Sequence, residues 1–162
     1  MIVVIMGVSG SGKTSVGTML ASRIDVPFHD ADDFHSGESV KKMSAGTPLT
    51  DTDREAWLHR LADLIDNLDE GGVLACSALK SKYRDVLEGT LKTVRWVYLA
   101  GGKAEIAERL ANRKGHYMAP DLLDSQFDAL EIPEDALHVK IDRPVGDIVD
   151  EILGRLDLDQ VL

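Results

Sequence analysis

The chain has 162 residues, of which 44% are hydrophobic and 28% charged, which is enough to bury the core of one domain. Its 18 basic and 28 acidic residues give a net charge of −10, which argues against nucleic acid as a main partner. Cys76 is the only cysteine, so an intrachain disulfide and a cysteine-rich zinc site are excluded and a cytoplasmic location is favoured. The apolar run at residues 2–6 is too short to span a membrane.

Apolar runs alternate along the chain with segments of helical periodicity. The runs predict strands over residues 2–6, 26–29, 73–76, 94–100 and 137–141. Helices are predicted over residues 13–24, from a capping box at Thr52 and Glu55 up to Gly71, and from Val145 onward. This alternation predicts one α/β domain over residues 1–162, with three layers and a five-stranded parallel sheet.

Two segments fit neither pattern. Residues 36–51 mix glycine, proline and charged residues, and residues 112–120 lie between two helical stretches. Both are predicted to be surface segments that are able to move.

A glycine-rich motif follows the first predicted strand. Residues 7–14 have the Walker A spacing, in which two glycines separated by four residues precede Lys and then Ser or Thr. Glycines let successive backbone N–H groups point at phosphate oxygens, and the next helix adds the positive end of its dipole. Lys13 is expected to hold the β- and γ-phosphates, and Thr14 to coordinate Mg²⁺. The predicted nucleotide-binding residues are Gly7, Val8, Ser9, Gly10, Ser11, Gly12, Lys13 and Thr14.

An acidic cluster at residues 30–33 follows the second predicted strand, at the sheet edge where open α/β folds bind ligands. Asp32 is expected near the γ-phosphate. A carboxylate there can accept the proton of an attacking hydroxyl or help to hold the metal through water. Asp33 is interpreted as a helix cap or a solvated loop residue.

Further segments carry a family resemblance that covers nearly the whole chain. They include residues 42–49 (Lys-Met-Ser-Ala-Gly-Thr-Pro-Leu), 76–80 (Cys-Ser-Ala-Leu-Lys) and 113–118 (Arg-Lys-Gly-His-Tyr-Met). With the Walker A loop and the acidic cluster, they make the chain similar to gluconokinases of the P-loop type, relatives of shikimate and nucleoside monophosphate kinases. The departures from the family pattern at Ala31, Ala56 and Tyr117 remove no charged or hydrogen-bonding group.

The resemblance implies a reaction and a substrate site. It implies transfer of the γ-phosphoryl group of ATP to the C6 hydroxyl of D-gluconate, giving 6-phosphogluconate, with Mg²⁺ as cofactor and in a homodimer. Arg54 and Arg84 would bind the substrate carboxylate, for which a planar guanidinium is suited. Lys42, His35 and Ser77 are further substrate-binding candidates.

Each candidate also has a structural alternative. Arg54 could point into water, and Arg84 could pair with Glu88 one helical turn away. His35 could cap its segment, and Trp57 is more readily interpreted as core packing than as a platform for a sugar.

Arg109 and Arg113 are four residues apart, so both should project from one face of a helix that leads into residues 112–120. The resemblance implies that this segment is a lid and that the two arginines contact the migrating phosphoryl group. Closure would also exclude water, which competes with the acceptor. The alternative is a solvated helix in which Arg109 pairs with Glu105.

Two rival functions fit parts of the sequence. A shikimate kinase shares the P-loop, but that family has a glycine triplet where this chain has residues 76–80. A non-catalytic sensor of ATP and gluconate would not need Lys13, Asp32 and the lid arginines, all of which are present. Phosphorylation of gluconate is therefore the expected function.

Overall fold

The computed structural model of the chain describes residues 1–113 and 120–158. In this part of the chain, strand β1 (Ile2–Met6) lies at the centre of a five-stranded sheet with the order β2-β3-β1-β4-β5. The other strands are β2 (Phe28–Asp30), β3 (Gly72–Ala75), β4 (Val94–Ala100) and β5 (Leu137–Lys140). Each pairing of neighbouring strands is parallel, so the predicted sheet is confirmed.

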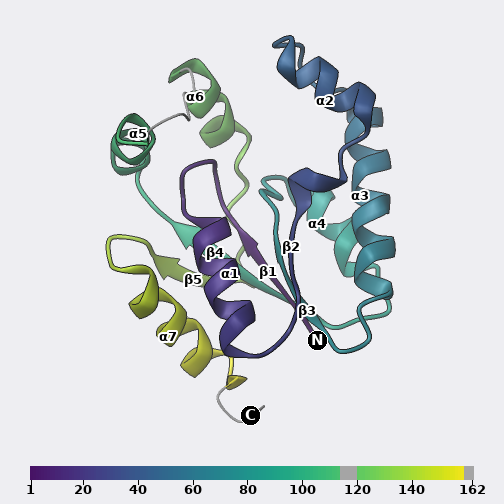
Figure 1. Cartoon of the computed structure of the whole chain (residues 1–162). Helices are drawn as coiled ribbons and strands as arrows, with labels where there is room; N and C mark the ends of the chain where they lie inside the picture. The colour runs from purple at the N-terminus through teal and green to yellow at the C-terminus, as the bar shows by residue number, and fades with distance from the viewer. Residues whose placement is uncertain (114–119, 159–162) are drawn as a thin grey trace.

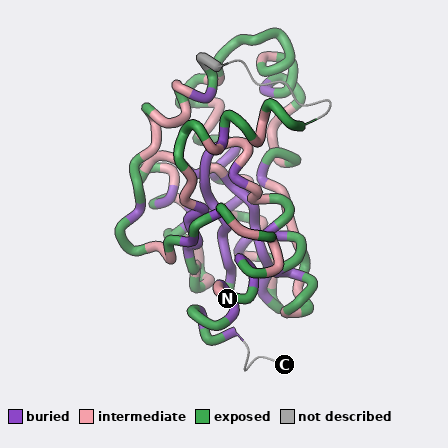
Figure 2. Tube along the Cα trace, turned by 90° about the vertical axis from the view of Figure 1, so that its left-hand side faces the viewer, coloured by how far each residue is buried: buried purple, intermediate pink, exposed green. Residues whose placement is uncertain are grey.

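Helices cover both faces of the sheet (Figure 1). They are α1 (Lys13–Arg23) and α7 (Val145–Arg155) on one face, and α3 (Asp51–Asp66) and α4 (Ser81–Glu88) on the other. Side chains of β1 alternate between the two cores: Val3 and Ile5 belong to the first, and Ile2, Val4 and Met6 to the second. A strand buried on both faces must be apolar throughout, which explains the continuous run. Figure 2 shows these buried strands running through the middle of the molecule.

The remaining elements lie near the carboxyl ends of the strands. They are the 3-10 turn η1 (Ala31–Phe34) and the helices α2 (Gly37–Ser44), α5 (Lys103–Ala111) and α6 (Pro120–Ala129). Figure 1 shows α2 and α6 on opposite sides above this edge of the sheet. Residues 114–119 of the predicted lid lie outside the described residues, so the lid stays a prediction.

Helix α2 lies within residues 36–51, where no helix was predicted. Ser36 caps it by accepting a hydrogen bond from the N–H of Ser39 at 3.1 Å, and Lys41 and Lys42 complement the dipole in its last turn. Gly46 follows with a φ of +74°. Capping and charge, rather than apolar periodicity, define this short helix, and for that reason the apolar pattern of the sequence does not indicate it.

Helix α3 begins earlier than predicted, because its capping residue is Thr50 and not Thr52. Thr50 Oγ1 accepts from the N–H of Asp53 at 3.1 Å, and Asp53 Oδ2 accepts from the N–H of Thr50 at 3.0 Å. Asp53 also accepts from Lys42 Nζ at 2.8 Å, which joins α2 to α3. The Lys42 hydrogen bond and the Thr50 N–H hold the pKa of Asp53 at about 2. The predicted box of Thr52 and Glu55 is wrong, because Asp53 fills the role of Glu in a box with Thr50.

Within the described residues, no helix is long and apolar enough to cross a membrane.

Leu61 tests the core between the sheet and α3. It is completely buried there, so Leu61→Ala should lower the free energy of unfolding by about 2–5 kcal/mol through lost burial and a cavity. Leu91, which is 91% exposed, is the matched control, and Leu91→Ala should change that free energy by less than about 0.5 kcal/mol. Urea denaturation measures both, and equal effects would contradict the assigned core.

Candidate active site

The P-loop connects β1 to α1 in a conformation that needs its glycines. Gly10 and Gly12 have φ angles of +82° and +97°, in the left-handed region. A Cβ on Gly10 would lie 2.8 Å from Cγ of Leu110, so α5 packs closely against the loop. Gly12 is the N-cap of α1 and offers no capping side chain, which leaves the first N–H groups of the helix for an anion.

Lys13 extends back over this loop. Its Nζ donates hydrogen bonds to the carbonyl oxygens of Gly7 at 3.0 Å and Val8 at 3.1 Å. Burial lowers the pKa of Lys13 below its usual value, although the negative charge of Asp32 opposes the shift. A buried ammonium group beside free helical N–H groups is suited to binding phosphate oxygens.

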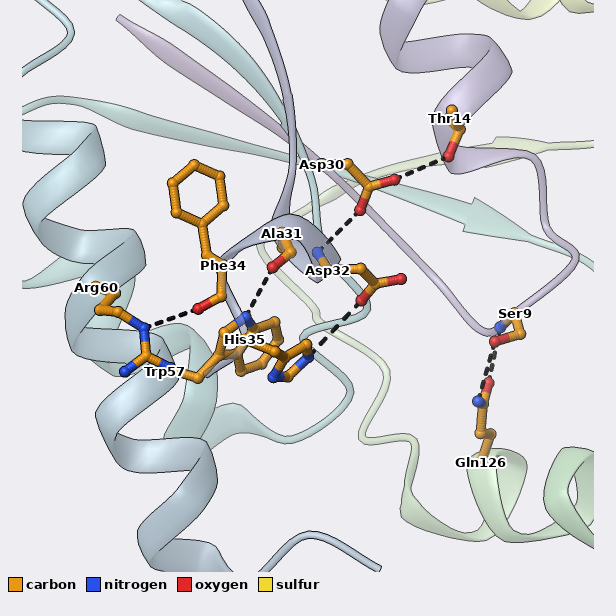
Figure 3. Close-up of polar contacts among 10 residues, drawn as sticks. All are labelled: Ser9, Thr14, Asp30, Ala31, Asp32, Phe34, His35, Trp57, Arg60 and Gln126. Atoms are coloured by element: carbon orange, nitrogen blue, oxygen red, sulfur yellow. Dashed lines mark hydrogen bonds and ion pairs between the residues drawn. The ribbon is translucent and has the colours of Figure 1, made fainter. Parts of the chain in front are cut away.

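Thr14, in the first turn of α1, meets the end of β2. Its Oγ1 lies 3.4 Å from Oδ2 of Asp30, and Oδ1 of Asp30 accepts from the N–H of Asp32 at 2.9 Å (Figure 3). A hydroxyl and a carboxylate side by side fit the preference of Mg²⁺ for oxygen ligands. Asp30 is not among the predicted site residues, although its place at the end of a strand was a usable signal.

Asp32 projects from η1, and its Oδ1 lies 3.9 Å from Nε2 of His35. The Asp32 side chain is 83% exposed to solvent, although its position in the lining of a cavity partly desolvates the carboxylate. This partial desolvation and then the charge of Asp30 raise the pKa of Asp32, against the opposite effect of Lys13 and His35. Asp32 is therefore a stronger base than an ordinary aspartate.

Helix α3 holds the turn that carries Asp32. Trp57 Nε1 donates to the carbonyl oxygen of Ala31 at 2.7 Å, and Arg60 Nε donates to that of Phe34 at 2.7 Å (Figure 3). The Trp57 ring also stacks on His35, with centroids 4.5 Å apart and an interplanar angle of 12°. Trp57 is 7% exposed, so its interpretation as core packing is confirmed, and it supports the site as well.

A cavity of about 400 Å³ opens beside Asp32, within the range of roughly 300–1,000 Å³ that is usual for small-molecule sites. Four residues predicted for the site line it: Asp32, His35, Arg54 and Ser77. Nδ1 of His35 is buried there without a hydrogen-bond partner among the described residues. The structure therefore brings these four side chains together around one cavity.

Cationic groups gather around Tyr83 in the same cavity. Arg54 Nη1 donates to Oη of Tyr83 at 3.4 Å, and the guanidinium carbon lies 5.9 Å from the centroid of the ring. Lys80 Nζ lies 5.9 Å from the same centroid. Because both side chains line the cavity, it has positive groups near Tyr83 and a carboxylate at Asp32.

The other two substrate-binding candidates, Lys42 and Arg84, lie outside the cavity lining. Lys42 pairs with Asp53, as described above. Arg84 is 7% exposed and donates to the carbonyl oxygens of Ala78 at 2.8 Å, Leu79 at 3.3 Å and Glu131 at 3.0 Å. As substrate ligands both residues stay predictions, and the contacts that they make here are structural.

The contacts of Arg84 hold a strained loop. Ala78 has a φ of +44°, which is costly for a residue with a side chain, and the loop that contains it also provides Ser77 and Lys80 to the cavity. The predicted alternative, a pair between Arg84 and Glu88, is not formed, and Glu88 accepts instead from Trp96 Nε1 at 2.7 Å.

Arg109 and Arg113 do not share one helix, because α5 ends at Ala111 and Arg113 follows as an exposed residue. Arg109 donates to the carbonyl oxygen of Ile141, just past β5, rather than pairing with Glu105. Its Nη1 also lies 3.7 Å from where a Cβ of Gly12 would be. Arg109 therefore lies over the P-loop, as its predicted role requires.

Gln126 links α6 to the P-loop. The N–H of Ser9 donates to Oε1 of Gln126 at 2.7 Å, and Nε2 of Gln126 donates to Oγ of Ser9 at 3.1 Å (Figure 3). The two partners are 117 positions apart, so no local pattern could have revealed the contact.

Comparisons with known proteins agree with this site. A family model described as shikimate kinase matches residues 9–143. A probable gluconokinase of Xenopus tropicalis is 44% identical over all of this chain and 96% of its own length. The thermosensitive gluconokinase of Escherichia coli K12 is 39% identical over 91% of this chain and 83% of its own length.

A solved structure extends the likeness to three dimensions. The crystal structure of a gluconokinase from Sinorhizobium meliloti 1021 superposes with a TM-score of 0.88 at 40% identity, covering 96% of this chain and 90% of that one. Sequence and fold thus agree over nearly the whole length of both proteins. The chain therefore belongs to the shikimate kinase family and, within it, to the gluconokinases.

Proposed function

We propose that residues 1–162 form a single kinase domain that transfers the γ-phosphoryl group of ATP to the C6 hydroxyl of D-gluconate, giving 6-phosphogluconate and ADP. The distribution of charge in the cavity gives this proposal its main support. Asp32 lies beside the P-loop, and Arg54 and Lys80 lie around Tyr83. D-Gluconate has a carboxylate at C1 and a primary hydroxyl at C6, so each end can meet a complementary group. Membership in the gluconokinases supports this assignment.

ATP is the co-substrate of this kinase family, and the P-loop is its proposed site. The N–H groups of residues 7–14 and the ammonium group of Lys13 would bind the phosphates, and Lys13 would then exchange its contacts with the carbonyl oxygens of Gly7 and Val8 for phosphate oxygens. Arg109 and Arg113 would stabilise charge on the migrating phosphoryl group, since Arg109 already lies beside Gly12.

Mg²⁺ is the proposed cofactor. Oγ1 of Thr14 and the carboxylate of Asp30 lie next to each other where the P-loop enters α1. Phosphate oxygens and water would complete the ligands of the metal. When bound, Mg²⁺ supplies neutralisation of the negative charge on the phosphates.

Asp32 is the proposed general base. Its carboxylate would accept the proton of the C6 hydroxyl during attack, and its raised pKa favours that transfer. His35 would donate to or accept from a neighbouring substrate hydroxyl through its ring nitrogens, and Trp57 holds that ring in place. Arg54, supported by Lys80, would bind the carboxylate.

The resemblance also supports a homodimer as part of this proposal. Light scattering coupled to size-exclusion chromatography would measure the mass directly.

Asp32→Asn tests the general base. Turnover of gluconate should fall by about 10²–10⁴-fold, because proton transfer is lost while the shape of the side chain is kept. The Kd for Mg·ATP should stay close to that of the wild type. The melting temperature should not fall, because a raised pKa means that ionised Asp32 costs stability at neutral pH, and Asn removes that charge. Near-normal turnover would refute the role.

Two arginine variants test which arginine binds the substrate carboxylate and which one only stabilises the loop at Ala78. Arg54→Lys should raise the KM for gluconate by about tenfold or more, because a two-pronged charged contact is lost, with little change in melting temperature. Arg84→Lys should instead lower the melting temperature by several degrees, since three carbonyl oxygens share its donors. If Arg84→Lys raised KM at constant melting temperature, Arg84 would be the substrate ligand.

The acidic limb of activity should follow Asp32. Its pKa is raised, so the active ionised form is lost as the pH falls through that raised value, above the titration of an ordinary aspartate. Asp30→Asn should lower the pKa of Asp32, because the charge of Asp30 contributes to raising it. Carbon-detected NMR titration of the Asp32 carboxyl measures both values. An unchanged pKa in the variant would contradict the assigned coupling.

A further inference from the structure

Tyr83 forms a wall between two cavities. One, the acceptor cavity, is the space beside Asp32 that Arg54 also lines. The other, the outer cavity, has a volume of about 210 Å³, and its lining includes Lys82 and Asp51 of α4 and α3. Because the Tyr83 side chain lines both cavities, it separates the charged groups of the outer cavity from those of the acceptor cavity.

The first turn of α4 holds Tyr83 in place. The N–H of Tyr83 donates to the carbonyl oxygen of Lys80 at 3.0 Å. Arg84, which follows Tyr83, is buried and donates to the carbonyl oxygens of Ala78 and Glu131. The Tyr83 ring also packs against the core between the sheet, α3 and α4. The ring therefore has the rigid support that a residue needs in order to position others.

Three cationic groups lie around this ring, and they belong to different cavities. Lys82 Nζ lies 5.6 Å from the ring centroid, lines the outer cavity and pairs with Asp51 at 3.7 Å. Arg54 and Lys80, each 5.9 Å from the centroid, line the acceptor cavity. Neither of these two forms an ion pair within the described residues, so their charge is available to a ligand of the acceptor cavity.

The Tyr83 side chain lowers the cost of holding two cations close together. The face of an aromatic ring is negative and attracts a cation that lies within about 6 Å of its centroid. Oη of Tyr83 also accepts a hydrogen bond from Arg54 Nη1 at 3.4 Å. A guanidinium has about five N–H groups, so this contact leaves others that can bind a ligand.

We propose that Tyr83 is a positioning residue for the acceptor carboxylate. Its ring and hydroxyl hold Arg54 and Lys80 together, so that both cations meet one carboxylate in the acceptor cavity. The proposal rests on the proposed function, because D-gluconate supplies that carboxylate. It gives Tyr83 no contact with the reacting hydroxyl or the phosphates, so Tyr83 should control affinity for the acceptor and not the chemical step.

Steady-state kinetics of two Tyr83 variants tests this role. Tyr83→Phe keeps the ring and its packing without the hydroxyl, so the KM for gluconate should rise by about two- to fivefold. Tyr83→Leu also removes the ring, so that KM should rise by about tenfold or more. The KM for Mg·ATP and the kcat at saturating gluconate should stay close to the wild type in both variants. An unchanged KM for gluconate, or a general loss of kcat and of affinity for both substrates, would overturn the proposal.

Two lysine variants form a matched pair of controls. Lys80→Gln removes a cation that lines the acceptor cavity, and it should raise the KM for gluconate. Lys82→Gln removes a cation that lies slightly closer to the same ring but lines the outer cavity, and it should match the wild type. Equal effects of the two changes would overturn the proposal, because total charge near the ring would then set the affinity.

Two measurements without turnover separate this role from the proposed function. Calorimetry gives the Kd for gluconate, which should weaken in the same order, from the wild type through Tyr83→Phe to Tyr83→Leu. NMR of the Arg54 guanidinium should show restricted rotation in the wild type and freer rotation in both variants. Binding of gluconate without ADP release would refute the proposed function alone. An Arg54 guanidinium that rotates freely in the wild type would overturn the role of Tyr83 alone.

Discussion

Burial of β1 on both faces is the constraint on which the site depends. Its five side chains fill two separate cores and its two edges pair with β3 and β4, which together define the point at which the P-loop leaves the sheet. Gly17 then lets α1 pack directly on β2, since a Cβ there would lie 2.6 Å from the ring of Phe28. This close packing brings Thr14 of α1 to Asp30 at the end of β2. The proposed metal position thus follows from core packing.

Local charge then makes an acidic protein able to bind anions. The chain carries a net charge of −10, so an anionic substrate meets an unfavourable overall field. Lys13 in the P-loop and Arg54 and Lys80 around Tyr83 place positive groups within the site itself. Asp32 lies in the same cavity, and its raised pKa reflects the partial desolvation that the cleft imposes. The same enclosure strengthens every charged contact made to a bound substrate.

Patterns confined to a few residues were predictable, and contacts between distant segments were not. Apolar runs predicted the parallel sheet, and spacing predicted the P-loop. The cap at Thr50 and helix α2 were missed because capping by short polar side chains leaves a weaker signal than apolar periodicity. The partners of Arg84 and Gln126 include residues 47 and 117 positions away, so their contacts exist only in the folded chain. The resemblance names candidate ligands but does not show which side chain faces the cavity.

Release of ADP from Mg·ATP tests the central claim most directly, with gluconate, shikimate, AMP and no acceptor compared side by side. The charge distribution of the cavity predicts rapid turnover with gluconate and only background rates in the other three reactions. Phosphorus NMR of the product should then show a phosphate ester on the primary C6 hydroxyl. Faster turnover with shikimate or AMP, or binding of gluconate without ADP release, would contradict the assignment of Asp32 and Arg54 to the two ends of the substrate.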